Sequence, residues 1–239
     1  MKRLAIALAT ALFVVALPLF FAGTAVRFLF SWAPLYEYGF DRYGVANYTG
    51  IERPDLTRAA AALVAYFNNE EQTVNLTVTQ RGVRRELFTE REVLHMVDVK
   101  ALVRLFYRVQ EGAALYLVGF VAVVVLRDRA NAARRIGSGL MWGSAITFAL
   151  LVALGALSFA DFETLFLQFH QLSFQANDYW LLDPRIHNLI AMFPAPFWLD
   201  STILLVLIVA AQAAMAFVVG WQVRRFLGAR AAVAPVGSS

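Results

Sequence analysis

The sequence predicts an all-α integral membrane bundle of four transmembrane helices with a small α+β extracytoplasmic cap. The chain of 239 residues is 60% hydrophobic and has a mean hydropathy of +0.60, whereas soluble domains are closer to half apolar. Apolar runs near the roughly 20 residues that a spanning helix needs recur along the chain. Clusters of Lys and Arg flank these runs, which is the pattern of short cytoplasmic loops.

Three of the four predicted spans are plain apolar runs, at residues 4–26, 140–160 and 203–221. Proline inside a helix removes a hydrogen bond, so we expect a kink at Pro18. A cleaved signal peptide is the competing interpretation of the first run. The apolar core of a signal peptide has about 7–15 residues, so the 23 residues of this run favour a retained helix.

The fourth span is less clearly marked. Residues 113–126 are uncharged, but this stretch makes only about 21 Å of helix. The helix must therefore begin near residue 101. Arg104, Arg108 and Glu111 then share one helical face. We expect an ion-paired face at the membrane surface there rather than an ion-conducting path.

The distribution of charge orients the chain. Basic residues cluster before the first span, between the second and third spans, and after the fourth. Residues 161–200 carry five acids and only one arginine, Arg185. The positive-inside rule therefore predicts cytoplasmic termini. The predicted parts are transmembrane helices at 4–30, 101–126, 138–160 and 201–223, extracytoplasmic cap segments at 31–100 and 161–200, a cytoplasmic loop at 127–137 and a cytoplasmic tail at 224–239.

Charge and cysteine content exclude several classes of function. The net charge of +4 would suit nucleic acid, but nine of the 21 basic residues lie in the three predicted cytoplasmic segments. Acidic residues more than balance the remaining 12 basic residues, so we expect no nucleic-acid partner. The chain has no cysteine, which excludes a cysteine nucleophile, an iron–sulfur cluster and a zinc–thiolate site.

The first cap segment shows its own pattern of elements. Aromatic residues crowd positions 32–48, and we interpret them as a belt at the membrane surface. An alanine-rich stretch indicates a helix, and a later stretch alternates apolar and polar residues with the period of a strand. The predicted elements are a helix at 55–68 and strands at 73–79 and 83–88, on either side of a turn at 80–82.

Two helix starts are marked by capping residues. Thr89 and Glu92 have the spacing of a capping box, which predicts that a helix carrying His95 begins there. Asp183 followed by Pro184 has the pattern of an N-cap with proline in the first helical position. We therefore expect a short helix at 184–192.

Three histidines are the candidate catalytic residues, because histidine exchanges protons near neutral pH. His95 lies three residues before Asp98, whose carboxylate can orient the ring from the same helical face. His170 lies in an aromatic run with Phe166 and Phe174 at helical spacing. Each can equally be a packing residue, and His187 fits an exposed polar position better than a site.

Other motifs do not point to chemistry. The histidines lack the short spacing of a zinc site, and the chain has no nucleophile elbow, Walker loop or dinucleotide fingerprint. Gly139 and Gly143 have the spacing of a helix-packing contact.

Two motifs resemble the signatures of the lipoprotein intramolecular transacylase family, bacterial four-span membrane proteins. One is the stretch from Thr89 to Lys100, which contains His95 and Asp98. The other begins at Phe169-His170. Its further members are Phe174, Asn177, Asp178, Trp180, Asp183, Pro184, Pro194 and Phe197, and Tyr43 and Thr49-Gly50-Ile51 fit weaker positions upstream. Ser173 departs from the pattern, which has a second aromatic residue there, and His187 has no counterpart in it.

The resemblance implies a four-helix membrane bundle with an extracytoplasmic cap in the bacterial plasma membrane. It implies an acyltransferase that moves the sn-2 acyl chain of a diacylglyceryl-cysteine lipoprotein to the α-amino group of the same cysteine. The partners are then the diacylated lipoprotein and membrane lipid, with no cofactor and no metal. His95 and His170 correspond to the catalytic residues. The implied supporting residues are Asp98, Lys100, Phe169, Phe174, Asn177, Asp178 and Trp180.

Elementary chemistry agrees with this reaction. Aminolysis of an ester needs a base for the amine, a donor for the oxyanion and a proton for the departing oxygen. We assign the base to His170 and the donor to His95, although the roles are interchangeable at this level. Two alternatives stay open: a metal-dependent membrane hydrolase that uses all three histidines, and a non-enzymatic membrane protein that binds a lipid or a partner.

Overall fold

The computed structural model describes residues 2–227, and the side chains of residues 4–225. Most of the predicted tail therefore lies outside the described residues. The chain forms two compact units. The first contains Met1–Ala25, Tyr107–Gly155 and Val206–Ser239, and the second contains Val26–Phe106 and Ala156–Leu205.

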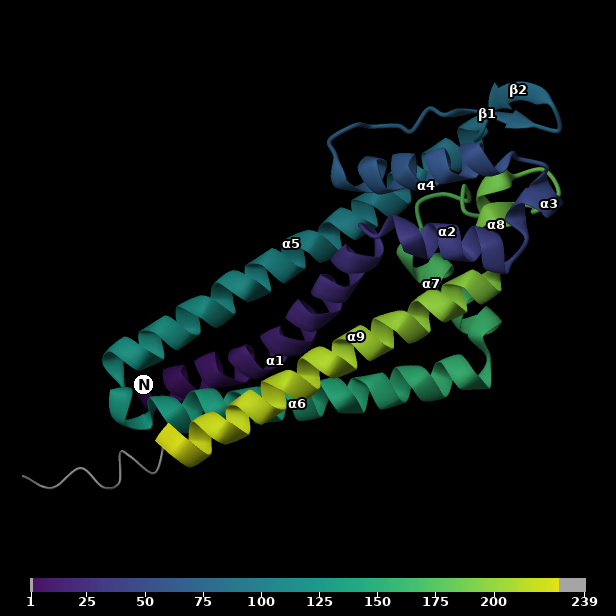
Figure 1. Ribbon diagram of the computed structural model, residues 1–239. Helices are drawn as coiled ribbons and strands as arrows, with labels where there is room; N and C mark the ends of the chain where they lie inside the picture. The colour runs from purple at the N-terminus through teal and green to yellow at the C-terminus, as the bar shows by residue number, and fades with distance from the viewer. Residues whose placement is uncertain (1, 228–239) are drawn as a thin grey trace, which may run out of the picture. The chain divides into compact units, whose positions relative to one another are not determined.

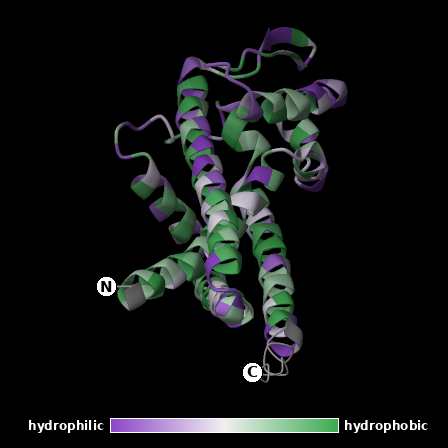
Figure 2. Cartoon of the chain, turned by 90° about the vertical axis from the view of Figure 1, so that its left-hand side faces the viewer, coloured by the Kyte–Doolittle hydropathy of each residue, from purple (hydrophilic) through white to green (hydrophobic). Residues whose placement is uncertain are grey.

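Four long helices run through the described chain (Figure 1). They are α1 (Lys2–Leu29), α5 (Glu90–Arg127), α6 (Arg129–Ala160) and α9 (Ala195–Gln222). Each contains one predicted span and is long and apolar enough to cross a membrane. Figure 2 shows hydrophobic residues along much of their length.

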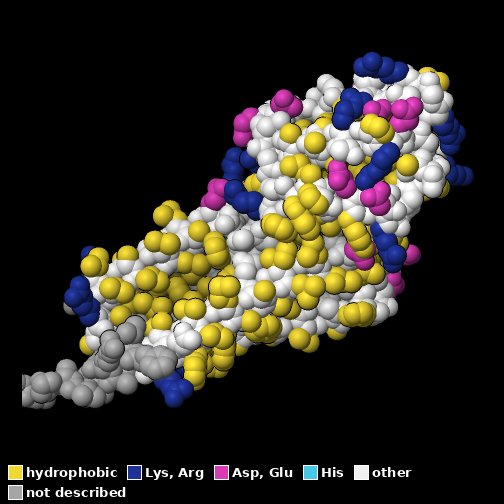
Figure 3. Space-filling model, viewed as in Figure 1, with side chains coloured by type: hydrophobic (Ala, Val, Ile, Leu, Met, Phe, Trp, Pro, Cys, Tyr) yellow, Lys and Arg dark blue, Asp and Glu magenta, His cyan; other side chains and the backbone are white. Residues whose placement is uncertain are grey.

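The long helices expose large apolar side chains. Leu115 is 77% exposed and Val152 is 72% exposed. Hydrophobic side chains cover much of the helix surface visible in Figure 3. Contiguous exposed apolar surface of this kind is unfavourable in water and favourable against lipid. The fold therefore suits a bilayer.

Glycines bring helices of the first unit into close contact. A Cβ atom on Gly143 of α6 would lie 2.3 Å from Leu17 of α1, and one on Gly139 would lie 2.7 Å from Phe13. The helix-packing role predicted for these two glycines is confirmed. Tyr116 of α5 also donates a 2.8 Å hydrogen bond to the carbonyl oxygen of Ala9 in α1.

The second unit holds the shorter elements. They are α2 (Ala33–Arg42), α3 (Val45–Thr49), α4 (Arg53–Asn68), β1 (Thr77–Gln80), β2 (Val83–Glu86), α7 (Phe162–Ser173) and α8 (Asn188–Met192). The strands pair antiparallel from Thr77 with Glu86 to Gln80 with Val83. Arg81 and Gly82 both have positive φ, as a two-residue hairpin turn of type I′ requires.

The predicted hairpin is correct in kind but too long at its start. The first strand begins at Thr77 instead of residue 73 and the second ends at Glu86 instead of residue 88. The buried carboxylate of Asp55 in α4 accepts hydrogen bonds from the Thr79 amide and from Arg58. This contact ties the hairpin to α4 at the paired residues.

The predicted helix at 184–192 begins four residues later than expected, at Asn188. Asp183 accepts a 2.9 Å hydrogen bond from the Arg185 amide and so closes a turn of two residues. Aspartate side chains favour such turns as readily as helix caps. The residue at the N-cap of α8 is His187.

Two further expectations need correction. The predicted loop at 127–137 is helical except at Asp128, since α6 begins at Arg129. The aromatic residues near position 40 are not only a membrane belt, because Tyr36 and Phe40 are buried. Tyr43 donates a 2.6 Å hydrogen bond to Asp200 of α9, which fixes the end of α2.

We expect Gly143→Val to destabilise the protein by about 1–3 kcal/mol, because the added side chain overpacks the contact between α1 and α6. Thermal unfolding in detergent measures the effect. Gly155→Val is the matched control, since nothing lies within 4 Å of a Cβ atom at that position. Equal unfolding temperatures for the two variants would contradict the packing role.

Candidate active site: a pair of histidines

Glu92 fixes the start of the helix that carries His95. Its Oε2 accepts hydrogen bonds from the Thr89 amide at 2.6 Å and from the Thr89 hydroxyl at 2.7 Å. The predicted capping box is thus present. The other oxygen, Oε1, accepts a 2.6 Å hydrogen bond from the Leu189 amide of α8. Glu92 is fully buried, and it joins the start of α5 to the segment that follows α7.

His170 lies near the end of α7, within an aromatic row. Asp161 caps this helix by accepting a 3.0 Å hydrogen bond from the Thr164 amide. Residues four apart share a helical face, and the rings of Phe162, Phe166 and His170 follow one another with centroids 5.9 and 4.4 Å apart. The helical spacing of these residues therefore also places His170 on the same face of α7 as the two phenylalanine rings.

The structure brings His95 and His170 together. Their ring centroids are 5.9 Å apart. Phe174 packs against both rings, at 5.1 Å from His95 and 5.6 Å from His170. Two polar rings thus share an aromatic surrounding, in which His95 and Phe174 are buried and His170 is half-buried.

Hydrogen bonding determines which nitrogen of His170 carries the proton. Its Nδ1 lies 2.8 Å from the carbonyl oxygen of Phe166. A carbonyl only accepts hydrogen bonds, so in the neutral ring Nδ1 bears the hydrogen and Nε2 keeps a free lone pair. Burial lowers the pKa of His170 below its usual value of 6.5, and the bond to Phe166 opposes this to a smaller extent. The ring is therefore neutral near pH 7 and suited to act as a base.

His95 differs in its hydrogen bonding. Its side chain is buried, and its Nδ1 has no hydrogen-bond partner among the described residues. No hydrogen bond joins Asp98 to His95 among the described residues, and Asp98 accepts a 2.9 Å hydrogen bond from Asn177 instead. A buried unpartnered ring nitrogen is unfavourable unless a ligand satisfies it.

The other candidate residues differ in their distance from the pair. Trp180 and Phe169 lie against His170, with ring centroids at 5.7 and 5.5 Å. Asp178 is largely exposed and forms a 3.2 Å ion pair with Arg91. Both Asn177 and Asp178 therefore connect the segment after α7 to α5.

Lys100 lies apart from the histidines. Its ammonium group donates to the side chain of Asn69 at 3.0 Å and to the carbonyl oxygen of Glu71 at 2.7 Å. It also lies 4.1 Å from the centroid of the Tyr66 ring. These contacts bind α5 to the end of α4, so Lys100 has a supporting role in the fold.

His187 also lies apart from the pair. It lines a separate hollow of about 740 Å³ together with Arg85 and Arg185. Its Nδ1 accepts a 3.0 Å hydrogen bond from the Asp183 amide. Within residues 2–227, no three histidine or acidic side chains are grouped closely enough to hold a metal ion. The hydrolase alternative therefore has no ligand set in this part of the chain.

Sequence reasoning missed the roles of Glu92, Phe166 and Trp198. The capping box predicted that one oxygen of Glu92 contacts Thr89. The other oxygen contacts Leu189, which lies 97 positions away in the sequence. Phe166 contacts His170 through its backbone carbonyl oxygen. Every residue type has this group, so the sequence gives no signal for the contact. Trp198 lies 5.9 Å from the Phe166 ring, and its indole donates to the carbonyl oxygen of Phe193.

Comparison with known proteins finds a matching family model. The family model described as "Lipoprotein intramolecular transacylase Lit" matches residues 11–198. An uncharacterised protein of Aquifex aeolicus (strain VF5) is 30% identical over 119 residues. That match spans half of this chain and half the length of the relative.

The fold resembles solved structures of a Bacillus cereus protein, the membrane-integral lipoprotein intramolecular transacylase Lit. One matches with a TM-score of 0.79 and 18% identity, covering 93% of this chain and 97% of that chain. A variant of the same protein with a histidine replaced by alanine matches with a TM-score of 0.74 and 18% identity, covering 93% and 94%. The predicted helical membrane fold is confirmed at this level.

We expect Glu92→Gln to lower the free energy of unfolding by about 1–3 kcal/mol, because an amide nitrogen replaces one buried acceptor and leaves a donor facing another donor. Chemical or thermal unfolding of the detergent-solubilised protein provides the measurement. Glu90→Gln is the control, since Glu90 is the exposed acid of the same helical turn. Unchanged stability in Glu92→Gln would show that the carboxylate does not hold the two segments together.

Proposed function

The chain belongs to the lipoprotein intramolecular transacylase family, and on this basis we propose that it is a membrane acyltransferase. In the proposed reaction, the sn-2 acyl chain of a diacylglyceryl-cysteine lipoprotein moves to the α-amino group of the same cysteine. The product is a lyso-form lipoprotein. One observation carries the proposal: the buried His95 and the half-buried His170 lie side by side, and His170 has a free lone pair while His95 has an unpartnered nitrogen.

The proposed location is the bacterial plasma membrane, with four spans and both termini in the cytoplasm. The cap and the histidine pair then face the extracytoplasmic side. The exposed apolar faces of the long helices and the basic clusters in the sequence support this arrangement. The partners are the diacylated lipoprotein and membrane lipid, with neither nucleic acid nor a cofactor required.

His170 begins the reaction in this account. The neutral α-amino nitrogen attacks the sn-2 ester carbonyl, and Nε2 takes one of its two protons as the carbon–nitrogen bond forms. The hydrogen bond from Nδ1 to Phe166 stabilises the charged imidazolium that forms. Holding amine and ester of one molecule in reacting geometry lowers the entropic part of the barrier.

His95 stabilises the tetrahedral intermediate in this account. An N–H of its ring donates to the oxyanion, for which the unpartnered Nδ1 is the natural group. When the carbon–oxygen bond breaks, His170 returns its proton to the departing glyceryl oxygen. One ring takes and returns the proton, so the protein ends in its starting protonation state.

The surrounding residues limit the access of water to the histidine pair and hold the pair in place. Phe169, Phe174 and Trp180 pack on the rings, and water would otherwise hydrolyse the ester. Asp98 and Asn177 hold the segment after α7 against α5. We assign them a positioning role.

We expect His170→Gln and His95→Gln each to lower the rate of acyl transfer by about 10²-fold or more, as for loss of a general base and of an oxyanion donor. The variants are expressed in a bacterium with diacylated lipoproteins, and the N-terminal peptide of one lipoprotein is analysed by mass spectrometry. His187→Gln is the matched control and should convert the lipoprotein normally. Full conversion by either of the first two folded variants would contradict the assignment.

The pH dependence of the transfer rate should reflect His170. The neutral ring is the base, so activity is lost as the pH falls through the lowered pKa. We expect the acidic limb of the single-turnover rate to have its midpoint below the usual 6.5. Thermal unfolding at each pH separates this effect from denaturation. The substrate's α-amino group ionises near pH 8 and gives a limb of its own, so the absence of a second limb below 6.5 would exclude a neutral His170 as the base.

A further inference from the structure

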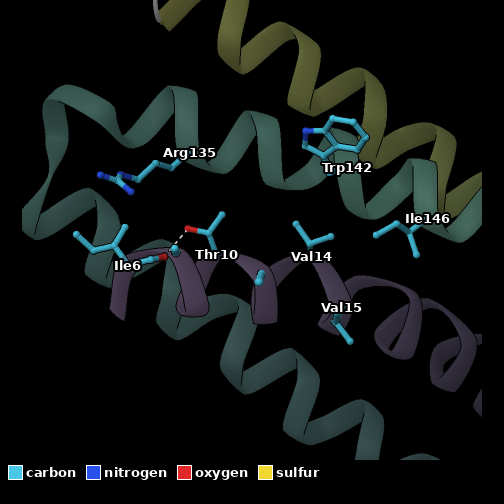
Figure 4. Close-up of a pocket in the computed structure, with 9 residues that line it drawn as sticks. Ile6, Thr10, Val14, Val15, Arg135, Trp142 and Ile146 are labelled. Atoms are coloured by element: carbon cyan, nitrogen blue, oxygen red, sulfur yellow. Dashed lines mark hydrogen bonds between the residues drawn. The ribbon is translucent and has the colours of Figure 1, made fainter. Parts of the chain in front are cut away.

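A groove runs between α1 and α6 in the first unit. It has a volume of about 830 Å³, within the range of roughly 300–1,000 Å³ that is typical of ligand sites. Its lining includes Ile6, Thr10 and Val14 from α1, and Arg135, Trp142 and Ile146 from α6. Figure 4 shows these two rows of side chains facing the groove from opposite helices.

The groove is apolar along its length and charged at one end. Ile6, Thr10 and Val14 are four residues apart and lie along one face of α1. The Thr10 hydroxyl already donates a 2.9 Å hydrogen bond to the Ile6 carbonyl oxygen, so it offers no free donor. Eleven residues separate Arg135 from Ile146, which corresponds to about 16 Å of helix. An amphipathic ligand with one charged end fits this gradient.

Arg135 has bonding capacity left at the charged end. Its Nε donates a 2.8 Å hydrogen bond to Asp128. No acceptor among the described residues bonds its two terminal nitrogens. Three further arginines occupy the same region against the single acid Asp128, at positions 127, 129 and 134. The end of the groove is therefore positively charged.

We propose that this groove binds an anionic phospholipid, with its phosphate on Arg135 and one acyl chain along Thr10, Val14 and Ile146. Arginine pairs readily with phosphate through two N–H groups, and basic pockets between transmembrane helices bind anionic head groups. Trp142 lies between head and chain, where tryptophan is favoured at a membrane interface. The site is independent of the histidine pair and of the proposed reaction.

The test titrates the purified chain in neutral detergent with phosphatidylglycerol, and separately with phosphatidylcholine of the same acyl chains. Native mass spectrometry counts the bound lipid. Loss of charge-assisted hydrogen bonds to the phosphate should weaken phosphatidylglycerol binding about tenfold or more in Arg135→Gln. Arg134→Gln is the matched control and should weaken binding much less than Arg135→Gln, because Arg134 adds to the local charge but does not line the groove.

A second variant tests the position of the acyl chain without altering the charge. Ala11 lines the groove, so Ala11→Phe should fill it and weaken binding of both lipids. Leu12→Phe is its control, since Leu12 is exposed and lies outside the lining. Equal binding of the two lipids, or unchanged phosphatidylglycerol binding in Arg135→Gln or Ala11→Phe, would overturn the proposal.

Discussion

A single buried carboxylate joins the two chain segments that carry the histidines. Glu92 has no exposed surface, and its oxygens accept from Thr89 in its own helix and from Leu189 in the second cap segment. A carboxylate is an acceptor only, so three donors suit it without conflict. Leaving any of these buried groups unpaired is unfavourable. This requirement holds the start of α5 against the segment that follows α7.

The histidine geometry depends on that junction. His95 lies one turn beyond Glu92, and the bond between Asp98 and Asn177 repeats the connection one turn further along. His170 reaches the same place from α7 and is held by the carbonyl oxygen of Phe166. The two rings therefore lie together among aromatic side chains. His170 has its Nε2 free, whereas His95 has its Nδ1 free. A base and a hydrogen-bond donor need that difference.

The sequence predicted those features that depend on local pattern. Apolar length located the four spans, although the second was expected to begin near residue 101 and α5 begins at Glu90. The capping box located the start of α5, and glycine spacing predicted a helix-packing contact on α6. Features that depend on distant residues were predicted less well. Asp98 was expected to contact His95, three residues away, but its hydrogen bond is to Asn177, 79 positions away. Asp183 has the residue type of a helix cap, and only the fold shows that it closes a turn.

We propose that the acyl chain moves within one lipoprotein molecule and that a pair of histidines catalyses this transfer. The most direct measurement uses the purified protein and a mixture of two synthetic diacylglyceryl-cysteine peptides. One peptide carries an isotopically labelled sn-2 chain, and the other has a different peptide mass and no label. The account predicts that the label moves to the cysteine nitrogen of its own peptide alone, at unchanged total mass. Label on the other peptide, or release of free fatty acid, would contradict it.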